Sequence, residues 1–222
     1  MTGGHPGVLF DVDGTLLDTN YLHVLAWSRA LRSHGHPEIT MASIHHSIGI
    51  ASEGLVRRLI GTTDDSVIEA HSAAFADLRD QAVAFPGVPE LLRRCRDAGL
   101  TVALATSGKP DDLDWMLPAI EGDDWIIGAV TSEDVDESKP APDLLTAGIA
   151  KFGLDADRTV AVGDSVWDVE AARQAGIASV ALECGGTSRQ ELEAVGATEI
   201  HRDPATLAAH FGDSVLAAIA SR

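Results

Sequence analysis

The spacing of apolar residues changes along the chain, and the change divides the sequence into two parts. Residues 8–12, "VLFDV", are apolar apart from one aspartate, which is typical of a strand buried in a sheet. From there to about residue 84, apolar positions recur at the three- and four-residue spacing of helices. Beyond residue 84, short apolar runs alternate with amphipathic segments. The pattern predicts a helical part inserted into a part that mixes strands and helices.

The helical part begins directly after the first predicted strand and contains no convincing strand pattern. Its predicted helices cover residues 20–35, 40–48, 53–60 and 64–83. The first of them closes with a glycine where a C-cap is expected. The turn-rich segment "FPGVPE", residues 85–90, ends this part of the chain.

The remaining chain alternates between helices and apolar strands. Helices are predicted at residues 88–99, 110–120, 141–153, 166–176 and 187–196, with a last one starting at 204. Strands are predicted at residues 100–106, 125–132, 159–164, 178–183 and 197–201. Apolar strands bounded by helices on both sides indicate a parallel sheet that is covered on two faces. We expect the first strand, residues 8–12, to belong to that sheet.

These elements predict an α/β fold, a doubly wound (Rossmann-like) parallel sheet core with an inserted all-helical cap. The core is assigned to residues 1–17 and 89–222, and the cap to residues 18–88. Two short crossings join them, which is the arrangement of a hinge.

The net charge of the protein narrows the range of partners that it is expected to bind. Among 222 residues, 16 are basic and 34 are acidic, which gives a formal net charge of −18. Such a surface repels nucleic-acid phosphates and anionic lipid, so we expect neither nucleic acid nor membrane as a partner. No leader segment and no apolar stretch long enough for a membrane span is visible, which predicts a cytoplasmic protein. We expect a monomer or a homodimer.

Polar residues gather where the predicted strands end, and in a doubly wound sheet ligands bind at that edge. Because side chains alternate along a strand, Asp11 and Asp13 are predicted to emerge on the same side of the first strand. The other strand ends contribute Thr106, Ser107 and Gly108, then Lys139, and then Asp164 and Asp168. Carboxylate oxygens suit Mg²⁺, while a lysine and turn amides suit a phosphoryl group. The combination predicts a metal-assisted site for a phosphate ester.

Each of these residues also has an ordinary structural interpretation. The "DG" at Asp13 is common in hairpin turns, Thr106 could cap a helix, and Lys139 could be a solvated loop residue. Asp164 and Asp168 could be acidic residues favoured near a helix N-terminus. However, the residues after "DGT" have a helical pattern and not that of a returning strand. Four such coincidences at one sheet edge favour a functional site.

Four short motifs, "DVDGT", "LATS", "SKPAPD" and "GDSVWD", resemble in order and spacing those of the haloacid dehalogenase superfamily. The resemblance extends from Val8 to about His201. The helical insertion after the first motif is similar to the C1 cap of phosphoglycolate phosphatases and β-phosphoglucomutases.

The resemblance implies a role for each motif residue. Asp11 would be the nucleophile and Asp13 the general acid and base. Asp11, Asp164 and the main-chain carbonyl of Asp13 would hold Mg²⁺. Thr106 and Lys139 would bind the phosphoryl group, with Ser107, Gly108 and Gly14 beside it, and Asp168 would support Lys139 or a metal-bound water.

The implied activity is a Mg²⁺-dependent phosphatase that hydrolyses a small organic phosphomonoester through an aspartyl-phosphate. A sugar-phosphate mutase similar to β-phosphoglucomutase is the alternative, because His23 matches a hinge histidine of those enzymes. Where they carry a cap arginine for a second phosphate, this chain has Ser52 and Glu53, and Glu53 would repel that phosphate. A non-catalytic protein that only binds a ligand is a third interpretation, which the complete set of motifs opposes. The sequence leaves open how His23, Ser52 and Glu53 contribute to specificity.

Overall fold

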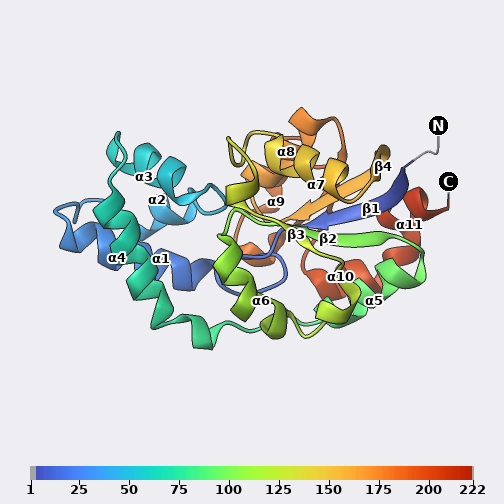
Figure 1. Cartoon of the computed structure of the whole chain (residues 1–222), viewed down its shortest axis with the longest axis horizontal. Coiled ribbons are helices and arrows are strands. Elements are labelled where there is room, and N and C mark those ends of the chain that lie inside the picture. The colour runs from blue at the N-terminus through green and yellow to red at the C-terminus, as the bar shows by residue number, and fades with distance from the viewer. Residues whose placement is uncertain (1–3, 222) are drawn as a thin grey trace.

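A six-stranded parallel sheet forms the centre of the protein (Figure 1). The computed structural model describes residues 4–221, apart from the side chain of Asp123. The strands lie in the order β3-β2-β1-β4-β5-β6, which is the order of a doubly wound sheet and confirms the predicted fold class. Their bounds are β1 His5–Phe10, β2 Thr101–Ala105, β3 Ala129–Val130, β4 Leu154–Gly163, β5 Ala178–Leu182 and β6 Glu199–His201.

Helices cover both faces of the sheet (Figure 1). The side chains of β1 point alternately to one face and to the other. Val8 and Phe10 pack with α5 (Val88–Asp97), α6 (Leu113–Ile120), α10 (Pro204–Ala209) and α11 (Val215–Ala220). Leu9 packs on the other face with α7 (Asp143–Lys151) and α8 (Val166–Ala175), and α9 (Arg189–Ala194) follows β5. A sheet buried on both faces explains why its strands have continuous apolar runs.

Four helices lie together at one end of the sheet (Figure 1). They are α1 (Asn20–Ser33), α2 (Met41–His45), α3 (Ser52–Ile60) and α4 (Asp65–Ala76). A hydrophobic core of their own, which includes Trp27, Ile44 and Val67, holds them together. As predicted, the described chain forms no strand between β1 and α5. The division into residues 18–88 and the remaining chain stays a prediction.

Several element ends differ from the predicted ones. β1 ends at Phe10 and not at residue 12, because the amides of Leu16 and Leu17 bond back to the Val12 carbonyl in a turn. α4 ends at Ala76 and not at residue 83, because the chain must return to the sheet there. The return passes through a 3₁₀ turn, η1 (Arg79–Gln81), to a bridge between Leu17 and Ala84.

Other differences lie in the sheet and at the C-terminus. The predicted strand 125–132 is reduced to Ala129–Val130, because it is an edge strand that pairs only with β2 and follows a 3₁₀ turn, η3 (Asp123–Trp125). β4 begins at Leu154, five residues earlier than predicted, because the polar start of the strand concealed its pairing with β1. The last predicted helix is divided into α10 and α11 by the turn η6 (Phe211–Asp213).

Helix length bears on membrane association. The longest helix of residues 4–221 is α1, with 14 residues. A membrane-spanning helix takes about 20 apolar residues. Within the described range, therefore, no helix has the length and apolar character to cross a bilayer.

Candidate active site

The site lies where the strand order reverses, between β1 and β4. Asp11 directly follows β1, Asp164 directly follows β4, and Thr106 directly follows β2. Lys139 reaches the same place from the loop after η4 (Ser132–Asp134). Since parallel strands end at one edge, residues far apart in the sequence meet at this point.

Lys139 is the positive centre of the site. Its side chain is only 1% exposed, and its Nζ contacts Asp11 Oδ1 and lies 2.7 Å from Asp168 Oδ1. Burial by itself would lower the pKa of the Lys139 ammonium, but the two carboxylates outweigh this effect and raise it. Lys139 therefore remains charged.

Asp11, Asp164 and Asp168 form a buried cluster with ligand oxygens within 4.8 Å of one another. Burial raises the pKa of Asp11 to about 7, against the opposing effect of Lys139. Burial, followed by the negative charges of Asp168 and Asp11, raises the pKa of Asp164 as well. Both raised pKa values reflect the cost of ionising buried carboxyls beside one another, a cost that a bound cation would remove. Clustered carboxylate oxygens of this kind fit Mg²⁺.

Both carboxylate oxygens of Asp168 already have partners within the protein. Its Oδ1 faces Lys139, and its Oδ2 accepts hydrogen bonds from the Ser165 amide at 3.1 Å and the Ser165 hydroxyl at 2.6 Å. Ser165 and Asp168 also form the capping box that starts α8, which fixes the carboxylate in place. Asp11 and Asp164 are thus the carboxylates of this cluster that are best placed for a metal.

Asp164 is oriented by residues at both of its oxygens. The Thr15 hydroxyl donates to Oδ1 at 3.1 Å, and the Asn20 amide donates to Oδ2 at 2.8 Å. The same Asn20 nitrogen donates to the Gly185 carbonyl at 2.9 Å. Sequence reasoning missed Asn20, which it interpreted only as the start of a helix. It also missed Gly185, although Gly185 follows the predicted fifth strand, at the same edge as the other motifs.

Gly185 leaves no room for a side chain. A Cβ at this position would overlap Asp164 Oδ2. We expect Gly185→Ala to displace that carboxylate and to weaken Mg²⁺ binding by roughly 10- to 100-fold, the usual effect of disturbing a residue behind a ligand. Isothermal titration with Mg²⁺ measures this change. Gly212→Ala is the control, because nothing lies within 4 Å of a Cβ there; equal affinity in both variants contradicts the prediction.

Asp13 has different surroundings from Asp11. Its side chain is half-buried, and its Oδ1 accepts a 2.6 Å hydrogen bond from the Thr19 hydroxyl and lies 3.3 Å from His23 Nε2. Burial by itself would raise the pKa of Asp13, but His23 and then Thr19 outweigh it and lower the pKa. The Asp13 carboxylate is not part of the three-carboxylate cluster of the described residues. One aspartate therefore faces Lys139, and the other faces the helical part.

Apart from Lys139, the predicted phosphate-binding residues lie in the segments that follow β1 and β2. The Thr106 hydroxyl is buried and accepts a 3.0 Å hydrogen bond from the Gly108 amide. The Ser107 hydroxyl donates instead to the Gly49 carbonyl, across to the helical part, at 3.0 Å. Gly14 has a φ of 78°, and a Cβ there would overlap Asn20, so only glycine fits. Their contact with a phosphate stays a prediction.

A cleft of about 1220 Å³ lies between the helical part and the sheet. Its walls include Asp13, His23 and Lys139, together with Ser52 and Glu53 of α3. The cleft reaches the carboxylate cluster through Lys139, which contacts Asp11. Ser52 and Glu53 thus face the space in which a ligand would lie.

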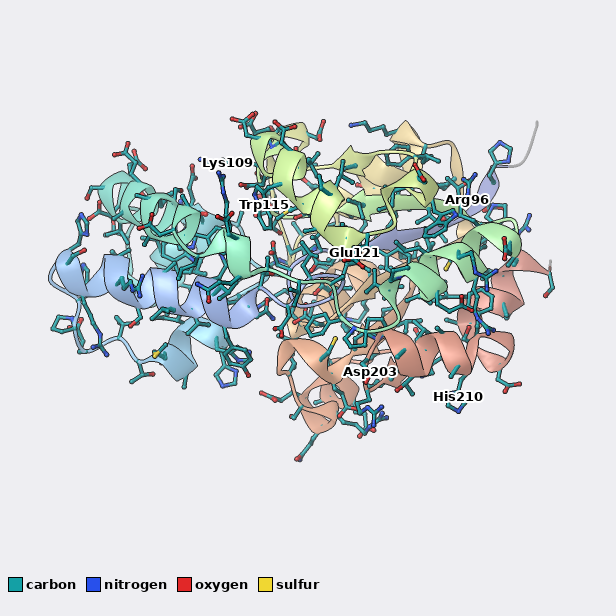
Figure 2. The ribbon with its side chains drawn as sticks, turned by 90° about the horizontal axis from the view of Figure 1, so that it is seen from below. Arg96, Lys109, Trp115, Glu121, Asp203 and His210 are labelled. Atoms are coloured by element: carbon teal, nitrogen blue, oxygen red, sulfur yellow. The ribbon has the colours of Figure 1, made fainter. Side chains whose placement is uncertain are left out.

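Aromatic and cationic side chains hold the two sides of the cleft together. Phe75 of α4 and Trp115 of α6 have ring centroids 5.7 Å apart, and the Arg58 guanidinium lies 4.8 Å from the Trp167 ring. Figure 2 shows Trp115, with Lys109 near it, where the helical part meets the rest of the protein. Both residues line the cleft, so the cleft extends to this line of contact.

Comparisons with known proteins agree with this geometry. The family described as haloacid dehalogenase-like hydrolase matches residues 8–182. A phosphoglycolate phosphatase of Pseudomonas putida is 30% identical over 200 residues, which cover 84% of this chain and 72% of the relative. An N-acetylmuramic acid 6-phosphate phosphatase of Pseudomonas aeruginosa is 29% identical, over 80% of this chain and 81% of its own. The crystal structure of a hydrolase from Pseudomonas syringae has a TM-score of 0.87 at 36% identity, over 94% of this chain and 98% of that one.

Proposed function

Because the chain belongs to the haloacid dehalogenase-like hydrolases, we propose that it is a Mg²⁺-dependent phosphatase that hydrolyses a small organic phosphomonoester through phosphorylated Asp11. The observation that carries the proposal is the buried contact of Asp11 with Lys139, beside Asp164 and next to a cleft that Asp13 lines. The named relatives are phosphatases of different small phosphate esters.

The reaction takes two displacements. A carboxylate oxygen of Asp11 attacks phosphorus, and the bond from phosphorus to the alcohol oxygen breaks. Asp13 gives that oxygen its proton, so that the product leaves as an alcohol. Asp13, now ionised, then takes a proton from water as the water attacks the phosphorylated Asp11, which releases inorganic phosphate and restores both carboxyl groups.

The other residues prepare these steps. The Lys139 ammonium offsets negative charge on Asp11 and on the phosphoryl oxygens. Asp11, Asp164 and the Asp13 carbonyl would hold Mg²⁺, which when bound supplies Lewis-acid stabilisation of the phosphoryl charge. Thr15 and Asn20 keep Asp164 oriented toward the cluster.

Asp13 must carry a proton when the alcohol leaves. In the protein alone, His23 and Thr19 lower the pKa of Asp13 and favour its ionised form. A bound phosphate ester brings two negative charges close to Asp13, and such charge raises a carboxyl pKa. Substrate binding therefore favours the protonated form that the first step needs.

The cleft also favours hydrolysis over phosphoryl transfer between two sugar positions. A mutase must hold a second phosphate at the far end of its substrate. Glu53, in the first turn of α3, lines the cleft, and its negative charge opposes such a group. We infer that Ser52, Glu53 and His23 take part in recognising the organic group of the ester.

Metal removal tests the proposed function. Turnover of p-nitrophenyl phosphate is expected to fall by at least about 100-fold after EDTA treatment and to return with Mg²⁺, since metal ions contribute several kcal/mol in such reactions. Colorimetric assay of p-nitrophenol measures it, with Na⁺ at matched ionic strength as the control. Full turnover without any divalent metal would exclude the proposed chemistry.

Product analysis separates the phosphatase from the mutase. With a sugar monophosphate and its bisphosphate, a phosphatase yields inorganic phosphate and free sugar. A mutase yields the isomeric monophosphate, and its appearance would replace the present proposal.

A further inference from the structure

Two histidines of the helical part form a chain that ends at Asp13. His23 of α1 has its Nε2 3.3 Å from Asp13 Oδ1. The other ring nitrogen of His23, Nδ1, lies 3.2 Å from Nε2 of His71 on α4. His71 is buried, and no residue within 4–221 forms a hydrogen bond with its Nδ1. The contact between the two rings thus joins α4 to the aspartate across α1.

Both rings are held in place by aromatic neighbours. His23 stacks on Phe75 with centroids 3.8 Å apart and planes 7° from parallel. His71 stacks on Trp27 with centroids 3.8 Å apart and planes 9° from parallel. This stacking fixes the plane of each ring, and the contacts of the ring nitrogens with each other and with Asp13 select one of the two flips within that plane.

Hydrogen-bond chemistry selects one arrangement of protons. A carboxylate only accepts, so the contact with Asp13 requires a proton on His23 Nε2. In neutral His23, Nδ1 is then an acceptor, and His71 Nε2–H is its donor. This leaves the unpartnered His71 Nδ1 without a proton, and a buried acceptor without a partner occurs more readily than a buried N–H without one. Burial, with a smaller effect of His23, lowers the pKa of His71 to about 2, which agrees with a neutral ring.

We propose that His71 is a positioning residue for the reaction, whose Nε2–H holds His23 in the tautomer and orientation that donate to Asp13. The role in catalysis rests on the proposed function, in which Asp13 transfers the proton. Without His71, only the Asp13 carboxylate favours the proton on His23 Nε2, so the tautomer and orientation of His23 are less well defined and its donation to Asp13 weakens. Proton transfer to the leaving oxygen then suffers, while the binding of phosphate does not.

Two substitutions of His71 separate positioning from packing. His71→Phe keeps an aromatic ring beside Trp27 but removes the donor, whereas His71→Gln keeps an N–H donor. We expect His71→Phe to lower kcat for an alkyl phosphate by roughly 10- to 100-fold, with KM nearly unchanged. In a single turnover, the loss in the rate of Asp11 phosphorylation should be several times smaller for p-nitrophenyl phosphate, because its leaving group needs no proton. His71→Gln should restore most of the rate, and His34→Phe, at an exposed position of the same part, should change nothing.

A measurement that needs no activity completes the test. In protein with ¹⁵N-labelled histidine, the ring shifts of His23 are expected to show a proton on Nε2, and a shift toward Nδ1 in His71→Phe. If His23 keeps the same tautomer in that variant, or if both substrates lose rate equally in the phosphorylation of Asp11 and His71→Gln restores nothing, the proposal is overturned. Because the spectrum can be read in an inactive protein, failure of the proposed function leaves this test intact.

Discussion

Replacing Asp11 by asparagine is expected to lower the turnover of every phosphomonoester by roughly 10⁴-fold or more, as the loss of a nucleophile does in other enzymes. The amide is nearly the same size as the carboxylate but has no charge with which to attack phosphorus. The substitution also removes the anion that Lys139 contacts, so Asp168 is the ion-pair partner that Lys139 keeps among the described residues. Steady-state release of p-nitrophenol by the pure variant measures the loss.

The intermediate itself can be followed. Acid quenching of wild-type protein during turnover should trap a phosphoryl group on the peptide that contains Asp11, and the variant should show none. Asp157→Asn, a change of the same kind at an exposed position, is the control and should keep both rate and intermediate. A phosphoryl group found on another residue, or an undiminished rate, would remove Asp11 from its proposed role.

The sheet and the centre of the site could be predicted because both follow from strand patterns. Apolar runs identify strands, and parallel strands end at one edge, so the polar residues after each run must meet. That reasoning brings together Asp11, Lys139 and Asp164 without any knowledge of the helices. It needs only the order of the elements, and moderate errors in their ends do not disturb it.

Contacts that depend on how the helices pack against one another and against the sheet could not be predicted in this way. His71 occupies the buried face of α4 with Val67 and Phe75, at a four-residue spacing that indicates only core packing. Its bond to His23 depends on how α4 crosses α1, which no local pattern records. Asn20 is similar, because its partners Asp164 and Gly185 are more than 140 residues away in the sequence.

The same limit applies to the pair of aspartates. Alternation predicts that Asp11 and Asp13 point the same way, but β1 ends at Phe10 and both lie in the loop beyond it. The Asp11 carboxylate contacts Lys139 and Thr15, whereas the Asp13 carboxylate contacts Thr19 and His23. Two like charges so close in sequence are therefore each given their own partners. In the proposed reaction, this separation lets Asp11 attack phosphorus while Asp13 transfers protons.

The second large loss of activity is expected when Asp13 is replaced. Asp13→Asn should lower the turnover of an alkyl phosphate by about 100-fold or more, the usual contribution of general acid–base catalysis. The main-chain carbonyl at this position does not change, so the affinities for Mg²⁺ and for inorganic phosphate should stay close to those of the wild type. Calorimetric titration of each ligand checks that the variant lost chemistry and not binding.

The way in which the loss of rate depends on the leaving group shows which proton transfer the variant lacks. p-Nitrophenolate departs without a proton, so in a single turnover Asp13→Asn should form phosphorylated Asp11 from p-nitrophenyl phosphate at nearly the wild-type rate. With an alkyl phosphate the same step should be slow, because the alkoxide needs the proton that asparagine cannot give. Hydrolysis of the phosphorylated Asp11 should be slow from either substrate, because this step depends on Asp13 as a base toward water. The phosphorylated protein should therefore accumulate from p-nitrophenyl phosphate. Equal losses for both substrates in the first step would mean that Asp13 only orders the site, and that the leaving oxygen takes its proton from another group.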